Sequence, residues 1–188
     1  NEERATLYSC LAVWYLAPGG TDPHKAIAVK QRHGYYDDYM ILKVGGFKIL
    51  DGLPSGNIGT QKLKTRVNGK EEELKQLWWT GVRPGGKLSI AVDVKKAGKY
   101  KLSILATKSF DYGIAQFSID GKKIGEPVDF YNANVTPVNP PESLGVHELS
   151  QGEHKLTIEV VGGNEKAKDR GKKEYMVGLH RLIVEPAE

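Results

Sequence analysis

The stretch Lys87-Leu-Ser-Ile-Ala-Val-Asp-Val94 alternates apolar and polar residues with a period of two. That period is the pattern of a β-strand with one buried face. The dipeptide Ala97-Gly98 follows and should turn the chain, and residues 100–106 then repeat the alternation. We expect the two segments either to pair as a hairpin or to be neighbours in a β-sandwich.

Short apolar segments of the same kind recur through the C-terminal half of the chain, at residues 115–119, 144–149, 156–160 and 175–184. Asp120-Gly121 is typical of a two-residue hairpin turn, because Asp and Gly tolerate left-handed backbone angles. Strands spaced by about 8 to 12 residues, with glycine-containing turns and no long helical period, indicate an all-β fold, a jelly-roll β-sandwich.

Three segments should depart from this pattern. Residues 51–59 contain three glycines and Pro54, which predicts a loop. The run Glu71-Glu-Glu-Leu-Lys-Gln76 could form one helical turn. Residues 5–16 form an apolar and aromatic run that favours a strand, and residues 21–38 have no clean period. Residues 1–38 are expected to be an N-terminal extension or the remnant of a preceding domain, ahead of a jelly-roll domain over residues 39–188. Asn1 in place of a starting Met fits a processed chain or a piece of a longer one.

The composition is that of a soluble globular protein, with 188 residues, 39% hydrophobic and 27% charged. The net charge is +4, but the lysine pairs Lys95-Lys96 and Lys122-Lys123 lie beside glycine turns, so we expect no nucleic-acid partner. No stretch approaches the roughly 18 apolar residues that span a bilayer, so we expect no membrane partner. Cys10 is the single cysteine; a buried structural thiol is expected there rather than a nucleophile.

A polar and aromatic run, Asp129-Phe-Tyr-Asn-Ala-Asn134, lies in the expected loop over residues 127–142. A tyrosine ring can stack on a sugar, and an amide both donates to and accepts from vicinal hydroxyl groups. The candidate ligand-binding residues here are therefore Asp129, Tyr131, Asn132 and Asn134. The alternative is that the asparagines hydrogen-bond their own backbone in turns.

Two further pairs are candidates for ligand contact. Trp78 and Trp79 are adjacent, so in a strand their side chains point to opposite faces. One of them should be a core residue, and the other is left for a sugar platform or for packing under a loop. Asp111 and Tyr112 precede Gly113 at a strand entry, where they could lie at the same end of the sandwich. The alternative for this pair is a capped turn with a partly buried tyrosine.

The sequence carries no convincing catalytic or metal site. Carboxylates are available, but glycoside hydrolysis needs two of them at a defined separation across the sugar. The histidines show no zinc-binding spacing. We therefore assign no catalytic residue, no metal ligand and no cofactor. The carboxylates and histidines considered are Asp37, Asp38, Asp111, Glu126, Asp129, His24, His33, His147, His154 and His180.

Several phrases of the sequence together resemble the galactose-binding-domain-like jelly rolls, which include the carbohydrate-binding modules of bacterial glycoside hydrolases. The resemblance covers residues 39–188. It is closer to the C-terminal domain of the bacterial glycosidase-like family that includes difructose-anhydride-processing enzymes, in which Trp78-Trp79 and residues 129–132 have counterparts. The phrases are Gly98-Lys-Tyr-Lys-Leu102, Asp111-Tyr-Gly-Ile-Ala-Gln-Phe117, Ile119-Asp-Gly-Lys122, Leu144-Gly-Val-His-Glu-Leu149, Gly152-Glu-His-Lys-Leu-Thr-Ile158 and Val177-Gly-Leu179.

The resemblance implies a non-catalytic carbohydrate-binding or accessory domain of an extracytoplasmic bacterial glycosidase-like protein, with a polysaccharide or oligosaccharide as its partner. It also implies a structural calcium, held by acidic residues in the first and last strands. Residues 40–44 contain no acidic residue, and His180 lies in the last strand, so the calcium ligands are missing. The alternatives are a structural domain that packs on a catalytic domain or on its own copies without binding sugar, and an independent glycoside hydrolase.

Overall fold

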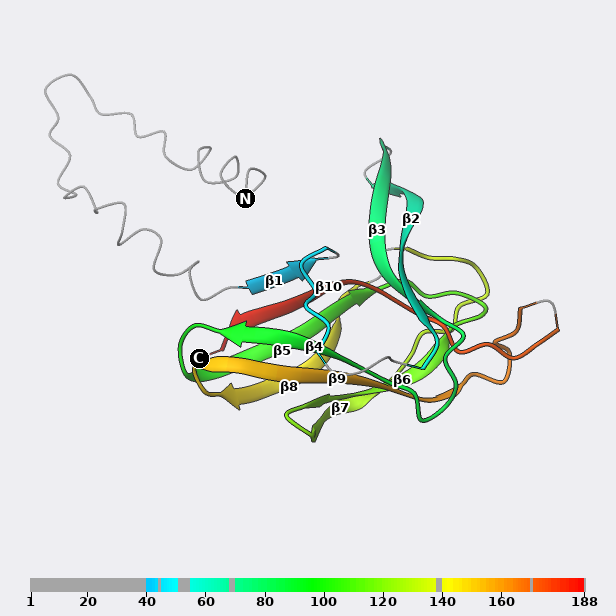
Figure 1. Ribbon diagram of the computed structural model, residues 1–188. Helices are drawn as coiled ribbons and strands as arrows, with labels where there is room; N and C mark the ends of the chain where they lie inside the picture. The colour runs from blue at the N-terminus through cyan, green and yellow to red at the C-terminus, as the bar shows by residue number, and fades with distance from the viewer. Residues whose placement is uncertain are drawn as a thin grey trace, which may run out of the picture. The chain divides into compact units, whose positions relative to one another are not determined.

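The computed structural model describes residues 40–43, 45–50, 55–67, 70–137, 140–169 and 171–187, and in these ranges it is all-β (Figure 1). The described residues form ten strands: β1 Met40–Lys43, β2 Asn57–Val67, β3 Lys70–Thr80, β4 Lys87–Val94, β5 Gly98–Ala106, β6 Gly113–Ile119, β7 Lys122–Asp129, β8 Glu142–Leu149, β9 Gly152–Gly163 and β10 Val177–Pro186. Within them, no helix is long and apolar enough to cross a membrane.

The strands make two antiparallel sheets. The larger has the order β2-β3-β10-β5-β8, with β1 also pairing with β10, and the smaller has the order β4-β9-β6-β7. This arrangement confirms the predicted β-sandwich. β4 and β5 belong to different sheets, so they are neighbours in the sandwich rather than partners in a hairpin.

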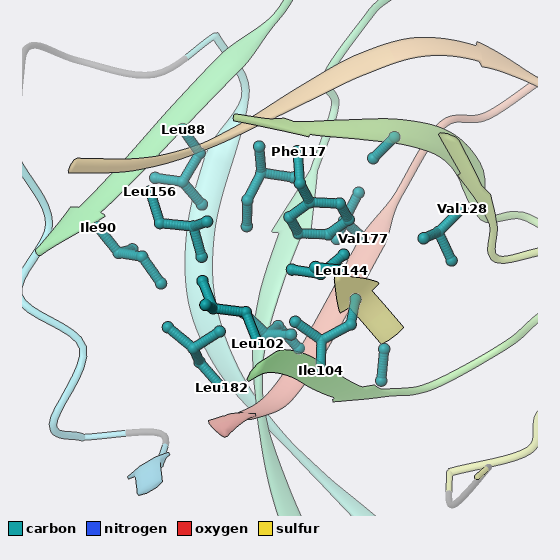
Figure 2. Packing of buried hydrophobic residues seen from close by; sticks show 14 of the residues in the cluster. Leu88, Ile90, Leu102, Ile104, Phe117, Val128, Leu144, Leu156, Val177 and Leu182 are labelled. Atoms are coloured by element: carbon teal, nitrogen blue, oxygen red, sulfur yellow. The ribbon is translucent and has the colours of Figure 1, made fainter. Parts of the chain in front are cut away.

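The core lies between the two sheets (Figure 2). Alternate residues of β4 and β5 point into it: Leu88, Ile90, Leu102 and Ile104 are at most 1% exposed. Phe117 of β6 lies among them and is fully buried. Burying each such side chain stabilises the fold by about 1.5 to 3 kcal/mol relative to leaving it in water.

The helical turn expected at residues 71–76 is wrong, because this segment belongs to β3. β3 pairs with β2 over eleven positions, from Asn57↔Thr80 to Val67↔Lys70, so the end of the expected loop over 51–59 is also strand. Lys62 and Glu73 form a cross-strand ion pair at 2.9 Å, and such opposite-charge pairs stabilise a two-stranded ribbon. The charged run therefore supplies part of one strand of a hairpin.

The β2–β3 hairpin diverges from the sandwich at a fork in β10 (Figure 1). β3 pairs with β10 only through Val177, Gly178 and Leu179, and β1 pairs with β10 from Arg181 onward. The buried His180 lies between the two: its Nδ1 is 2.9 Å from the Lys75 carbonyl oxygen of β3. His180 thus ties the departing hairpin to the sheet.

Other local predictions hold or fall outside the described residues. Asp120 and Gly121 have φ angles of 49° and 82°, which confirms the left-handed hairpin turn between β6 and β7. The loop expected at 127–142 is shorter, because β7 continues to Asp129 and β8 begins at Glu142. The N-terminal extension over residues 1–38, with Cys10, lies outside the described residues, so its boundary stays a prediction.

Candidate loop-end binding site

Four connections lie together at one end of the sandwich, toward the right of Figure 1. They follow β3, β5, β7 and β9 and span residues 81–86, 107–112, 130–141 and 164–176. Because the strands are antiparallel, these connections share one end, which we call the loop end. The opposite turn end carries the short connections at residues 95–97, 120–121 and 150–151.

The loop end is held by hydrogen bonds between its loops. The Ser109 amide donates to the Phe130 carbonyl at 2.9 Å, and the Asn132 amide donates to the Ser109 carbonyl at 3.1 Å. On the other side, the Lys168 amide donates to the Phe110 carbonyl at 2.8 Å. Residues 109–110 are therefore bonded to the β7–β8 loop and to the β9–β10 loop at once.

The predicted residues of the β7–β8 loop are brought into this network. Asp129 accepts from the Tyr131 amide through Oδ1 and from the Asn164 side-chain amide through Oδ2, both at 2.8 Å. The Asn132 amide group donates to the Thr136 hydroxyl at 2.6 Å. These groups hold the loops, which is the alternative role for the asparagines. Half-buried Tyr131 and exposed Asn134 make no side-chain hydrogen bond within the described residues.

Asp111 and Tyr112 lie at the same end, as predicted. The Ser109 hydroxyl donates to Asp111 at 2.6 Å. Tyr112 is 3% exposed, and its hydroxyl accepts a hydrogen bond from the Gln76 side-chain amide at 2.8 Å. Burial raises the pKa of Tyr112 to about 12, against the opposing hydrogen bonds of Gln76 and Trp78. Tyr112 is thus a neutral link between the loop end and the root of the β2–β3 hairpin.

The two tryptophans differ in burial. Trp79 is fully buried, and its indole N–H donates to the Ser55 carbonyl at 2.6 Å, so it is the core residue of the pair. Trp78 is partly exposed on the opposite face of β3, and its cross-strand partners are Gly59 and Gly178. Apart from chain neighbours, no described atom lies within 4 Å of a Cβ built on Gly59. Trp78 therefore keeps open space on one flank.

Sequence reasoning missed Phe110. Its side chain is 37% exposed, and it is the one aromatic residue among the exposed large hydrophobic side chains of the described residues. It lies between Ser109 and Asp111, inside the network of loops. The available signal was its position in a turn just before Asp111-Tyr112-Gly113, where no strand alternation assigns the ring to the core.

The calcium implied by the resemblance does not fit these residues. Among the described residues, no three His, Cys, Asp or Glu side chains gather in a way that could hold a metal ion. β1 has no acidic residue, and His180 uses its Nε2 in a 2.8 Å hydrogen bond with the Thr107 hydroxyl and its Nδ1 in the bond to Lys75. Burial lowers the pKa of His180, so the neutral ring serves as a structural connector.

A scan against protein-family models finds no match, and a search of curated proteins finds none either. Solved structures do match. A Paenibacillus xanthan lyase is 16% identical with a TM-score of 0.63, over 78% of this chain and 13% of that chain. A Podospora anserina GH26-CBM35 β-(1,4)-mannanase is 10% identical with a TM-score of 0.49, over 81% of this chain and 28% of that chain.

A family 35 carbohydrate binding module from Clostridium thermocellum is 15% identical with a TM-score of 0.48, over 79% of this chain and 98% of that chain. The chain spans a small part of the first two proteins and nearly the whole of the third. Identities this low establish the fold and leave the ligand open. The described part of the chain has a two-sheet β-sandwich fold, which it shares with part of the xanthan lyase.

Proposed function

We propose that this chain is a non-catalytic carbohydrate-binding domain, which recognises a polysaccharide or oligosaccharide at its loop end. The observation that carries the proposal is the exposed ring of Phe110 within a network of fixed loops, one residue from the bridge between Ser109 and Tyr131. Aromatic rings supply a stacking surface for the C–H face of a sugar, and a free amide supplies a donor and an acceptor for its hydroxyl groups.

Phe110 and Tyr131 are brought close by the backbone. Ser109 and Tyr131 form a parallel bridge, and Phe110 follows Ser109 directly. The hydrogen bonds around Ser109 fix both segments before a ligand arrives, so little conformational entropy is lost on binding. Trp78, on the face of β3 opposite Trp79, offers a second partly exposed ring near the same end of the sandwich, although part of it packs against the core.

The domain would serve as an accessory to a catalytic domain of an extracytoplasmic bacterial enzyme that acts on glycans. The match to part of a xanthan lyase supports this setting, since the chain covers 13% of that protein. We propose no cofactor, because calcium has no acidic ligands at β1 and His180.

The test is a glycan array followed by titration calorimetry on the wild type, Phe110→Ala, Tyr131→Ala and Trp78→Ala. We expect the Phe110 or Tyr131 variant to lose at least about tenfold in affinity, since stacking of this kind contributes about 0.5 to 1.5 kcal/mol beyond its buried area. Val146→Ala is the matched control, because Val146 is 54% exposed on β8, away from the loop end.

Thermal melts would show that each variant is folded. Absence of binding to every glycan by the folded wild type would contradict the proposal. Loss of affinity in Trp78→Ala alone would move the site from the loop end to the face of β3 that carries Trp78.

A further inference from the structure

Three acidic groups of the loop end, Asp111, Asp129 and Glu142, are engaged within the protein. Asp111 accepts a hydrogen bond from Ser109, and Asp129 accepts one through each carboxylate oxygen. Glu142, at the start of β8, forms an ion pair with Lys108 at 2.7 Å. These three carboxylates are thus already compensated by donors or by a cation.

Two lysines of the neighbouring β9–β10 loop, by contrast, form no ion pair within the described residues. Lys166 and Lys168 are exposed and flank the fully buried Ala167. The Lys166 amide donates to the Asn164 side chain at 3.0 Å, and the Lys168 amide donates to Phe110 at 2.8 Å. Within the described residues, neither lysine forms an ion pair.

The backbone therefore holds two lysines without an ion pair near the proposed stacking residues, and Glu165 and Asp169 flank them in the sequence. Asn164 is bonded to Asp129, and Lys168 is bonded to Phe110, so the lysine loop is fastened to both loops of the site. Residues 164–176 carry five cationic and three acidic side chains in the sequence. The net charge of this loop is positive even when its own acidic residues are counted.

We infer that the glycan bound at the loop end is anionic, and that Lys166 and Lys168 recognise its carboxylate or sulfate groups. The inference rests on the proposed sugar-binding function and names the chemical class of the ligand. A lysine ammonium is a mobile point charge on a long stem, suited to an acidic group whose position varies along a polymer. Stacking on Phe110 would hold the sugar ring, while the two ammonium groups select the charge.

The lysines of the turn end provide a matched control. Lys122 and Lys123 are exposed beside the Asp120-Gly121 turn, at the far end of β6. The seven residues of β6 separate the two ends by roughly 23 Å, at about 3.3 Å per residue. That distance exceeds the Debye length of about 8 Å at physiological ionic strength, so these charges should not reach a ligand at the loop end.

The experiment uses a panel of acidic polysaccharides, each beside its own neutralised form, with carboxyl groups reduced to alcohols or sulfate groups removed. Calorimetry would compare the wild type with the Lys166→Gln/Lys168→Gln and Lys122→Gln/Lys123→Gln double variants. We expect the wild type to bind an acidic polymer at least about tenfold tighter than its neutralised form. We expect the first variant to lose that preference and the second to keep it.

Each result decides the question. A preference for carboxylated or for sulfated members would support the inference and identify the acidic group. Equal binding of acidic and neutralised forms, with affinity still lost in Phe110→Ala, would overturn the inference and leave the proposed function standing. Equal losses in both lysine double variants would also overturn it, because the attraction would then be general. No binding to any polymer would remove the proposed function itself.

Discussion

The loop end and the turn end of this sandwich are held by different means. The turn end is closed by short connections, and the Asp120-Gly121 turn combines left-handed backbone angles with hydrogen bonds of the Asp120 side chain to His154 and Lys155 of the adjacent strand. The loop end has connections of six to thirteen residues, held by hydrogen bonds from one loop to another and by buried polar side chains such as His180 and Tyr112.

The difference separates two tasks of the chain. Local turn chemistry sets the register of the strands at the turn end, which leaves few groups for a ligand. The loop end is built from contacts between residues far apart in sequence, so rings and amides such as Phe110 and Asn134 can remain exposed on a fixed framework. Variants can test whether the two ends depend on these different interactions.

The largest expected effect is at the anchor of the β7–β8 loop. Phe130 is fully buried, and its amide and carbonyl bond to Gly113 and Ser109. Phe130→Ala should lower the free energy of unfolding by about 3 to 5 kcal/mol, because it leaves a cavity under the loop. Urea denaturation would measure this, with Phe110→Ala as the exposed control. Similar small effects for both would show that the loop end is not coupled to the core.

His180 should have the next largest effect. His180→Ala removes hydrogen bonds to Lys75 and Thr107 and leaves those buried groups unpaired, at a cost of about 2 to 3 kcal/mol. Burial lowers the pKa of His180 below its usual value near 6.5. The stabilisation by the neutral ring is therefore present above pH 6.5 and lost as the pH falls through the lowered pKa.

Urea melts at a series of pH values would check that stability falls on acidification for this reason. The wild type should lose stability on acidification more steeply than His180→Gln, which cannot titrate. Parallel curves of stability against pH for the two proteins would contradict the assignment of His180 as a neutral connector. Hydrogen exchange of the β2–β3 hairpin amides would add a local readout, since loss of the bond to Lys75 should release the hairpin at its root.

His154 at the turn end should show the opposite pH dependence. Its Nδ1 is 2.6 Å from Asp120 and its Nε2 is 2.8 Å from the Ser150 carbonyl, so both nitrogens face acceptors and the charged ring is favoured. Burial alone would lower the pKa of His154, but the hydrogen bonds that its ring donates to Asp120 and to the Ser150 carbonyl outweigh burial and raise the pKa.

The resulting stabilisation is fully present below pH 6.5 and lost as the pH rises through the raised pKa of His154. It should not exceed about 1 kcal/mol, because the Asp120 side chain is 52% exposed and the pair is screened by solvent. Asp120→Asn should flatten the alkaline limb of the stability profile. Burial alone would raise the pKa of Asp120, but hydrogen bonds from Lys155 and His154 outweigh burial and lower that pKa, so the variant should also lose the part of the acid limb that Asp120 contributes below pH 3.8. An unchanged alkaline limb would contradict the assignment.

The sequence predicts the turn end better than the loop end for a physical reason. Alternation and the Asp120-Gly121 turn are local signals, and the structure confirms both. The β2–β3 hairpin was missed because its charged residues 71–76 also suit a helix, whereas their role as strand depends on β2 across the ribbon. The Asn68-Gly69 dipeptide between the two strands was the local sign of a hairpin.

The candidate site was predicted in part. Tyr131, Asn132 and Asp111 do meet at the loop end, through Ser109. Burial divided the candidates in ways that no local pattern shows: Tyr112 is a buried link, and Phe110 is exposed although it is as apolar as any core residue. Exposure in a loop depends on tertiary packing, so the position of Phe110 in a turn signals only that no strand alternation assigns its ring to the core.

The smallest expected effect compares one glycine at each end. Gly121 and Gly85 have φ angles of 82° and 89°, and no described atom lies near a Cβ built on either, so an added methyl group meets backbone strain alone. Gly121→Ala should cost about 1 kcal/mol, because both residues of its two-residue turn need left-handed angles. Gly85→Ala should cost less, since the six-residue connection around it can redistribute the strain.

Urea melts of the two variants would measure the difference. A larger cost at Gly85 would mean that the hydrogen bond from the Gly85 amide to the Val160 carbonyl, at 2.7 Å, is decisive. It would then fix the connection over residues 81–86 as tightly as the hairpin fixes Gly121. Turn chemistry would then matter as much at the loop end as at the turn end.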